Sequence, residues 1–140
     1  MAYDLDRFLV EQQGAYEGVL AELRRGQKAG HWIWFIFPQV AGLGHSLMSQ
    51  MFAIASLDEA RAYLDHPVLG ARLRECAGIV LATTEGTAVE IFGSLDALKV
   101  RSCMTLFQRA APDEQVFAEV LARFYDGVPD EATDVRLGRP

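Results

Sequence analysis

The sequence predicts an all-α fold, a compact multihelical single domain. Hydrophobic residues make up 51% of the 140 residues and charged residues 23%, as in an ordinary globular domain and unlike a disordered chain. Apolar residues recur at spacings of three and four along most of the chain, which is typical of amphipathic helices. No repeat or linker divides the sequence. We therefore expect one domain over residues 1–140, with a core over about residues 4–127 and a polar tail over residues 128–140.

Two helices are predicted in the N-terminal part. Asp4 is expected to cap a short first helix, which places Phe8 on its inner face. The second helix carries an apolar stripe and ends at Gly26, because glycine readily takes the left-handed conformation that closes a helix. The stripe consists of Tyr16, Val19, Leu20 and Leu23.

Residues 31–37 do not fit a helical pattern. They are rich in aromatic and β-branched side chains and Pro38 follows them, so their composition suits a short buried strand. A strand needs a partner, however, and the sequence holds no second run of this type. We therefore expect a buried piece that is irregular or briefly helical.

Capping motifs mark the next helices. Ser56 and Glu59 form a capping box, and that helix should end before His66. Pro67 suits the first turn of the following helix, because its missing N–H costs nothing there. The apolar stripe of this helix consists of Leu69, Leu73, Cys76, Ala77, Val80 and Leu81.

Three further helices are predicted after residue 86. Thr87 opens a very short one that Gly93 closes, and Ser94 or Asp96 is expected to cap the next, which turns Leu98 inward. The last helix restarts near residue 112, where a proline precedes two acids, and the tail after it is expected to be frayed. The residues expected at the centre of the core are Leu20, Leu23, Leu64, Leu73, Val80, Leu106, Phe117 and Leu121.

Charge and hydropathy exclude several classes of function. The net charge of -6 disfavours general nucleic-acid binding, because an acidic surface repels a phosphate backbone. The longest apolar run, over residues 32–37, is too short to cross a membrane, and the first residues lack the features of a signal peptide. The sequence therefore predicts a cytoplasmic protein that does not bind membranes.

The cysteines and histidines do not suggest a metal site. Cys76 and Cys103 both lie in apolar helical stripes, which predicts two reduced and buried thiols. The three histidines, His31, His45 and His66, are scattered singly, whereas a zinc site needs ligands at short spacings. We expect no metal and no cofactor.

The acids are unevenly distributed. No Asp or Glu occurs over residues 23–57 or over residues 97–112, although basic residues fall in both stretches. If the two stretches meet in the fold, they create a local positive potential within an acidic protein. Residues 28–46 are therefore the best candidate for a functional site, with Lys99 and Ser102 opposite them.

Each part of this candidate site also has a plainer explanation. Trp34 beside a lysine and a histidine suits an anionic, ring-bearing ligand, but an indole in an apolar run also suits the core. The glycines near Ser46 suit an anion at a helix start, or simply a loop with a serine cap. Lys99 three residues after Asp96 suits a surface ion pair as well as a site. The predicted ligand-binding residues are Lys28, His31, Trp34, Gln39, His45, Ser46, Lys99 and Ser102.

Several phrases in the sequence resemble one family. They cover residues 31–39, 42–46, 56–64, 66–73 and 91–107. Together they are similar to an uncharacterised, mainly bacterial family known as domain of unknown function number eighteen-ten, which includes a mycobacterial conserved hypothetical protein. The resemblance implies a compact multihelical fold and no established activity. The name calpastatin, often attached to this family, does not suit a globular composition.

The sequence leaves three functional hypotheses open. The first is a small cytosolic domain that binds a small anionic ligand, such as a nucleotide-like molecule, at residues 28–46. The second is an enzyme that hydrolyses a nucleotide- or ADP-ribose-type glycosidic bond, although no catalytic motif supports it and no catalytic residue can be named. The third is a helical protein-interaction module in which the aromatic run is core. The protein partner is unknown.

Overall fold

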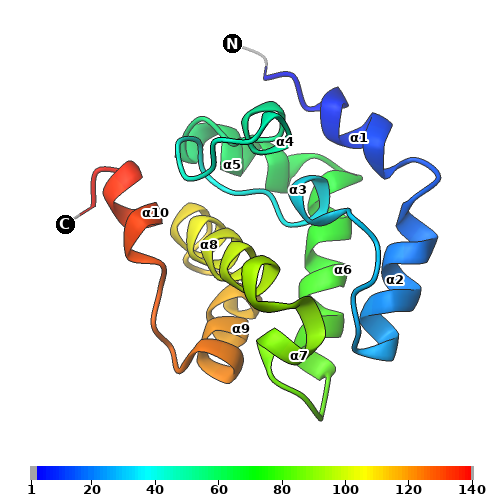
Figure 1. Ribbon diagram of the computed structural model, residues 1–140. Coiled ribbons are helices and arrows are strands. Elements are labelled where there is room, and N and C mark those ends of the chain that lie inside the picture. Colours follow the sequence, from blue (N-terminus) through cyan, green and yellow to red (C-terminus); the bar gives the residue numbers. More distant parts are fainter. Residues whose placement is uncertain (1–2, 140) are drawn as a thin grey trace.

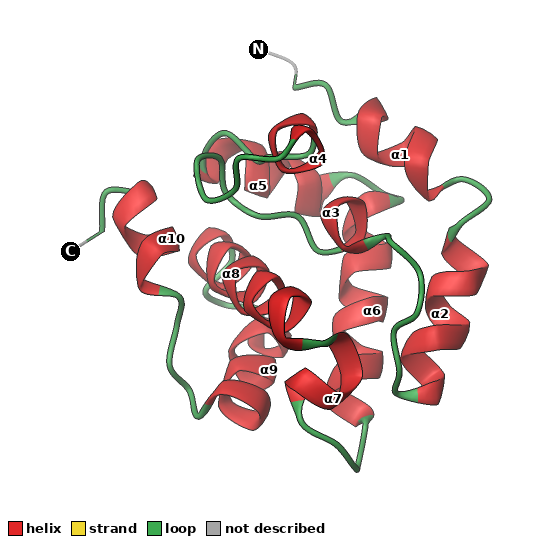
Figure 2. Ribbon diagram, viewed as in Figure 1, coloured by secondary structure: helices red, strands yellow, loops and turns green. Residues whose placement is uncertain are grey.

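The computed structural model describes residues 3–139, and within them it contains ten helices and no strand (Figures 1 and 2). The prediction of an all-α fold is confirmed. Met1 and Ala2 of the predicted domain and Pro140 of the predicted tail lie outside the described residues. The helices are α1 (Asp6–Gln12), α2 (Tyr16–Arg25), α3 (Ile33–Ile36), α4 (Leu47–Met51), α5 (Leu57–Asp65), α6 (Leu69–Ala82), α7 (Ala88–Phe92), α8 (Ser94–Ala110), α9 (Gln115–Tyr125) and α10 (Glu131–Arg136).

The long helix α8 lies at the centre of the molecule, where it packs against α5, α7, α9 and α10 (Figure 1). Helix α6 packs against α2, α5 and α9. The two long helices, α6 and α8, therefore both contact α5 and α9. All eight residues expected at the centre of the core are buried. No helix within residues 3–139 is both long and apolar enough to cross a membrane.

A row of aromatic rings connects four helices through the core. The ring of Tyr63 on α5 lies 5.1 Å from that of Phe8 on α1 and 5.4 Å from that of Phe107 on α8. Phe107 in turn lies 5.9 Å from Phe117 on α9. Rings at such separations gain an electrostatic contribution beyond the area that they bury. The row therefore contributes to the packing of α1, α5, α8 and α9.

The aromatic segment after residue 30 is a single helical turn, α3, as expected for a buried piece without a strand partner. The buried side chain of Gln12 on α1 holds it in place, since its Nε2 donates to the carbonyl of Phe35 at 2.7 Å. The other end of the same amide accepts from Arg72 on α6 at 3.2 Å. One polar side chain therefore connects α3 to two helices, with its donor and acceptor both used.

Some of the predicted helix starts are confirmed and others are wrong. Thr87 and Glu90 form the capping box of α7, and Ser56 caps α5. Asp4 does not cap α1, because the helix begins two residues later, after Leu5. Neither Ser94 nor Asp96 caps α8, since the chain passes from α7 to α8 through one glycine and Ser94 is already helical.

Up to residue 139, the C-terminal tail is not frayed. Residues 131–136 form α10, whose first N–H groups Asp130 caps by accepting from the backbone of Thr133 at 3.0 Å. Helix α10 lies against α8, and both Ser102 and Thr105 are buried beneath the chain near Asp130. The prediction that Leu98 points inward is also wrong. Leu98 lies on the same side of α8 as Ser102, but one turn before it, and is 59% exposed.

The two cysteines give a simple chemical prediction. Cys76 and Cys103 are both free and buried, and burial raises the pKa of the Cys76 thiol to about 12. A thiol must be accessible and ionised to react, so both should resist a disulfide reagent such as dithiobisnitrobenzoate in the native protein. Two thiols should react once the protein is unfolded. Fast reaction of either thiol in the native state, or fewer than two after unfolding, would contradict this expectation.

Candidate functional site

Lys28 has a buried side chain and lies in the irregular chain that follows α2. Its backbone N–H donates to the carbonyl of Ile91 at 2.8 Å, which anchors this part of the chain beside α7. Its side chain is only 7% exposed, and its ammonium lies 2.7 Å from Oδ2 of Asp96 on α8. The same ammonium donates to the carbonyl of Gly30 at 2.5 Å. A buried ammonium needs such partners, because an unpaired charge in the interior is very costly.

Asp96 joins the two acid-free stretches of the sequence. Its second carboxylate oxygen lies 3.2 Å from the ammonium of Lys99, so one carboxylate binds two ammonium groups. Burial by itself raises the pKa of this carboxyl, but the hydrogen bonds and charges of Lys28 and Lys99 outweigh burial and lower it. Asp96 is therefore ionised at neutral pH, and the three groups together carry one positive charge.

Both lysines lie over indole rings. The ammonium of Lys28 is 5.1 Å from the ring centre of Trp32, and that of Lys99 is 4.8 Å from the ring centre of Trp34. Both separations are in the range of a cation–π interaction. The indole faces are thus already in contact with the protein's own cations, which leaves less room for the ring stacking that the sequence suggested.

The two indole N–H groups differ. Nε1 of Trp32 donates to Glu22 at 2.9 Å, and this carboxylate also accepts the backbone N–H groups of Ala29 and Gly30. Burial raises the pKa of Glu22, but these three donors lower it below its usual value. Nε1 of Trp34, in contrast, is the buried side-chain donor without a hydrogen-bond partner within residues 3–139.

The remaining predicted site residues do not join this cluster. His31 is exposed and Gln39 is half-buried, and no hydrogen bond, ion pair or cation–π contact connects either side chain to Lys28, Trp34 or Lys99 within the described chain. Ser102 lies on α8 one turn after Lys99, but its hydroxyl is 3.1 Å from both the Leu98 carbonyl and Asp130. Its hydroxyl is therefore used at the start of α10.

The loop before α4 is the loop with a serine cap that was one of the two interpretations of this stretch. Ser46 caps α4 by accepting the N–H of Ser49 at 3.1 Å, while His45 beside it is exposed. A side chain at Gly44 would collide with Ser49, and Gly42 has a φ of +95° with the Arg136 guanidinium against it. These glycines are needed for backbone geometry and close packing. The loop is a tight turn that a serine cap closes.

Sequence reasoning identified Asp96 as a partner of Lys99, but it identified neither Glu22 nor the contact of Asp96 with Lys28. The stretch over residues 23–57 is acid-free in sequence, but Glu22 and Asp96 approach it in space and neutralise much of its charge. The Asp96–Lys99 pair was expected as an i,i+3 contact and is present. The contact of Asp96 with Lys28 depends on how α8 lies against the chain after α2, which no local pattern indicates.

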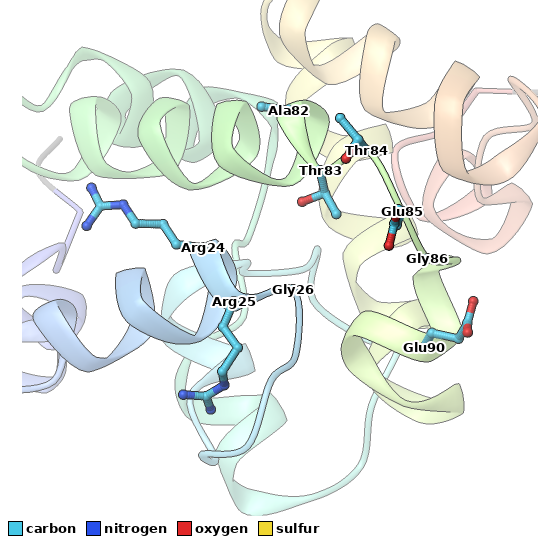
Figure 3. A pocket seen from close by; sticks show the side chains of 9 residues that line it. All are labelled: Arg24, Arg25, Gly26, Ala82, Thr83, Thr84, Glu85, Gly86 and Glu90. Atoms are coloured by element: carbon cyan, nitrogen blue, oxygen red, sulfur yellow. The ribbon is translucent and has the colours of Figure 1, made fainter.

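A separate hollow of about 530 Å³ lies between the ends of α2 and α6, next to α7 (Figure 3). Arg24, Arg25, Glu85 and Glu90 border it, but their charged ends point in different directions (Figure 3). One oxygen of Glu90 already caps α7 by accepting the N–H of Thr87. The hollow therefore gathers no set of groups that acts on one ligand.

No candidate metal site is present within residues 3–139, because no three His, Cys, Asp or Glu side chains gather closely enough there to hold an ion.

The family model described as "Protein of unknown function (DUF1810)" matches residues 2–137. A comparison with curated proteins gives no match. The crystal structure of the conserved hypothetical protein Rv1873 from Mycobacterium tuberculosis is 46% identical, with each chain covered to 99% and a TM-score of 0.96.

Proposed function

The chain belongs to the DUF1810 family, whose function is unknown, and from the geometry of its own site we propose that it binds a small anionic ligand at Lys99 and Trp34. The observation that carries the proposal is the unpartnered Nε1–H of Trp34 beside the ammonium of Lys99. A buried donor without an acceptor costs about 1–3 kcal/mol. Such a cost is expected where a ligand supplies the acceptor.

The charges at the site indicate which part of a ligand it would hold. Lys28 is buried and committed to Asp96, whereas Lys99 is 26% exposed and can turn toward solvent. In the proposed binding mode this flexible side chain rotates, and the anion bound to its ammonium accepts the indole N–H. Glu22 is already bound to Trp32 and to the backbone of Ala29 and Gly30, so Lys99 is the cation left for a ligand. A single cation suits a group with one negative charge, such as a carboxylate or a phosphodiester.

A thermal-shift experiment tests this proposal. The probes are acetate, inorganic phosphate, AMP and ADP-ribose, each at concentrations up to about 10 mM. A true ligand at roughly 100 times its Kd stabilises by about 2.7 kcal/mol, which raises the Tm by several degrees. Lys99→Ala should abolish the rise. Trp34→Phe, which keeps a ring but lacks the N–H, should weaken binding by about tenfold.

Arg24→Ala is the matched control, since it removes an exposed cation outside the site and should leave the ligand response intact. All three variants should fold, because Lys99 and Arg24 are not core residues and Trp34 is only half-buried. A Tm that none of the probes raises, or a rise that survives in Lys99→Ala, would contradict the proposal.

The hypothesis of a glycosidic-bond hydrolase gains no support from the site. Such an enzyme needs a carboxyl group that is protonated at neutral pH, and therefore a raised pKa. The two carboxyl groups at the site, Asp96 and Glu22, both have a lowered pKa. They are suited to hold cations and N–H donors, and not to donate a proton.

A further inference from the structure

The chain from Val128 onward occupies a polar strip on α8, which we define as Arg101, Ser102, Thr105 and Arg109. The guanidinium of Arg109 binds Asp134 with two parallel hydrogen bonds of 2.8 Å. Ser102 lies 3.1 Å from the carboxylate of Asp130. This strip lies in the second acid-free stretch of the sequence. One of its cations, Arg109, and one of its hydroxyls, that of Ser102, are bound by acids of the chain's own C-terminal segment.

Three further contacts involve the backbone of that segment. Arg101 donates to the carbonyls of Val128 and Pro129 at 2.9 and 3.1 Å. The N–H of Asp130 donates to Oγ1 of Thr105 at 2.8 Å. A polypeptide presents a carbonyl and an N–H at each of its residues, whereas a free carboxylate or phosphate carries no N–H donor. The strip is therefore fitted to a peptide.

The length of the strip also favours a peptide. Arg101 and Arg109 are separated by two turns of α8, or about 12 Å at 1.5 Å per residue. A single small anion cannot contact both ends. A peptide segment can do so, since the carbonyls of Val128 and Pro129 bind Arg101 while Asp134 binds Arg109.

Helix α10 is held with little apolar burial. Thr133 is its one buried residue, and Val135 is 64% exposed. Hollows of about 490 and 320 Å³ lie along its sides, next to Leu43 and next to Pro129 respectively. Figure 1 shows it at the edge of the molecule, after an extended connection from α9. Segments with few buried apolar contacts open more readily than the core does.

We propose that the strip on α8 is a binding site for an acidic helical peptide whose N-cap residue is an aspartate. Helix α10 is the internal, displaceable occupant of this site. The external ligand has the same chemistry as residues 128–136: an aspartate at the helix N-cap and a second acid four residues later. Competition with α10 makes binding in trans depend on its release. This site is separate from Lys99 and Trp34, and it does not depend on the ligand proposed there.

The first test measures release of α10 in the full-length protein by amide hydrogen exchange. At about 0.5 M NaCl, where ion pairs are screened, the amides of residues 131–136 should exchange about tenfold faster than at about 0.05 M. The amides of α6 should respond far less to salt, because the buried side chains of that helix are apolar. Equal protection of α10 and α6 at both salt concentrations would overturn the idea that α10 is displaceable.

The second test measures binding in trans by fluorescence anisotropy, with a labelled peptide of residues 128–139. It should bind saturably to the full-length variant Asp130→Ala/Asp134→Asn, whose own α10 is weakened, and at least about tenfold more weakly to wild type. Adding Arg109→Ala to the variant should remove the binding. A peptide with both aspartates replaced by asparagine is the matched control and should not bind. Absence of saturable binding to the double variant, or equal binding of both peptides, would refute the proposed site.

Discussion

Replacing Gly70 by alanine should destabilise the protein by about 3 kcal/mol or more, although it adds a single methyl group. Gly70 is a buried residue in the first turn of α6, where the chain has just turned back from α5. A Cβ at this position would collide with the backbone carbonyl of Leu64, near the end of α5. A backbone group cannot rotate away as a side chain can. The two helices would therefore have to separate.

The same helix offers a matched control. Gly78 also lies in α6, but a Cβ there would meet no atom within 4 Å apart from its own helix. Alanine has a helix propensity better than that of glycine by about 1 kcal/mol, so Gly78→Ala should stabilise the protein by up to this amount. Urea unfolding of both variants measures the two free energies. Changes of the same sign in both variants would show that close packing at Gly70 is not what distinguishes them.

Replacing Asp96 by alanine should cost about 3–5 kcal/mol of unfolding free energy, as expected when a buried ion pair loses one partner. The substitution leaves the ammonium of Lys28, 7% exposed, without its carboxylate. It also leaves the ammonium of Lys99 without the same partner. The large effect comes from the buried charge that remains, and not from the net stabilisation that the ion pair contributes.

A second substitution tests that explanation. In Asp96→Ala/Lys28→Met no unpaired ammonium is buried, so most of the lost stability should return. Asp58→Ala, which breaks an exposed pair with Arg61, should cost less than about 1 kcal/mol. If the double variant is no more stable than Asp96→Ala, the cost lies in packing rather than in the charge of Lys28.

The pH dependence of stability should also change in the single variant Asp96→Ala. The pKa of Asp96 is lowered in the folded protein, so its contribution is fully present above the ordinary aspartate pKa of about 3.9. That contribution is lost as the pH falls through the lowered value. Unfolding between about pH 5 and pH 2 should therefore be less steep with pH in Asp96→Ala than in wild type.

The sequence by itself determined where most helices form. Apolar spacing placed Leu73 and Val80 on the buried face of α6, and both are 1% exposed. Gly26 ends α2 with a left-handed φ of 74°, and Thr87 and Glu90 cap α7 as their spacing indicates. All of these features involve groups within about one helical turn of each other. They can therefore be predicted without knowledge of the rest of the fold.

Tertiary structure alone decided how these helices use their polar residues. Lys28 and Lys99 share Asp96 because the chain after α2 lies against the start of α8. The tail became a helix because α8 supplies partners for Asp130 and Asp134, which polar composition alone did not reveal. Hydrogen bonds and ion pairs between distant segments depend on the positions of whole helices, and those positions are set by the packing of the core. A local sequence pattern identifies a side chain's chemistry but not the group that it will meet.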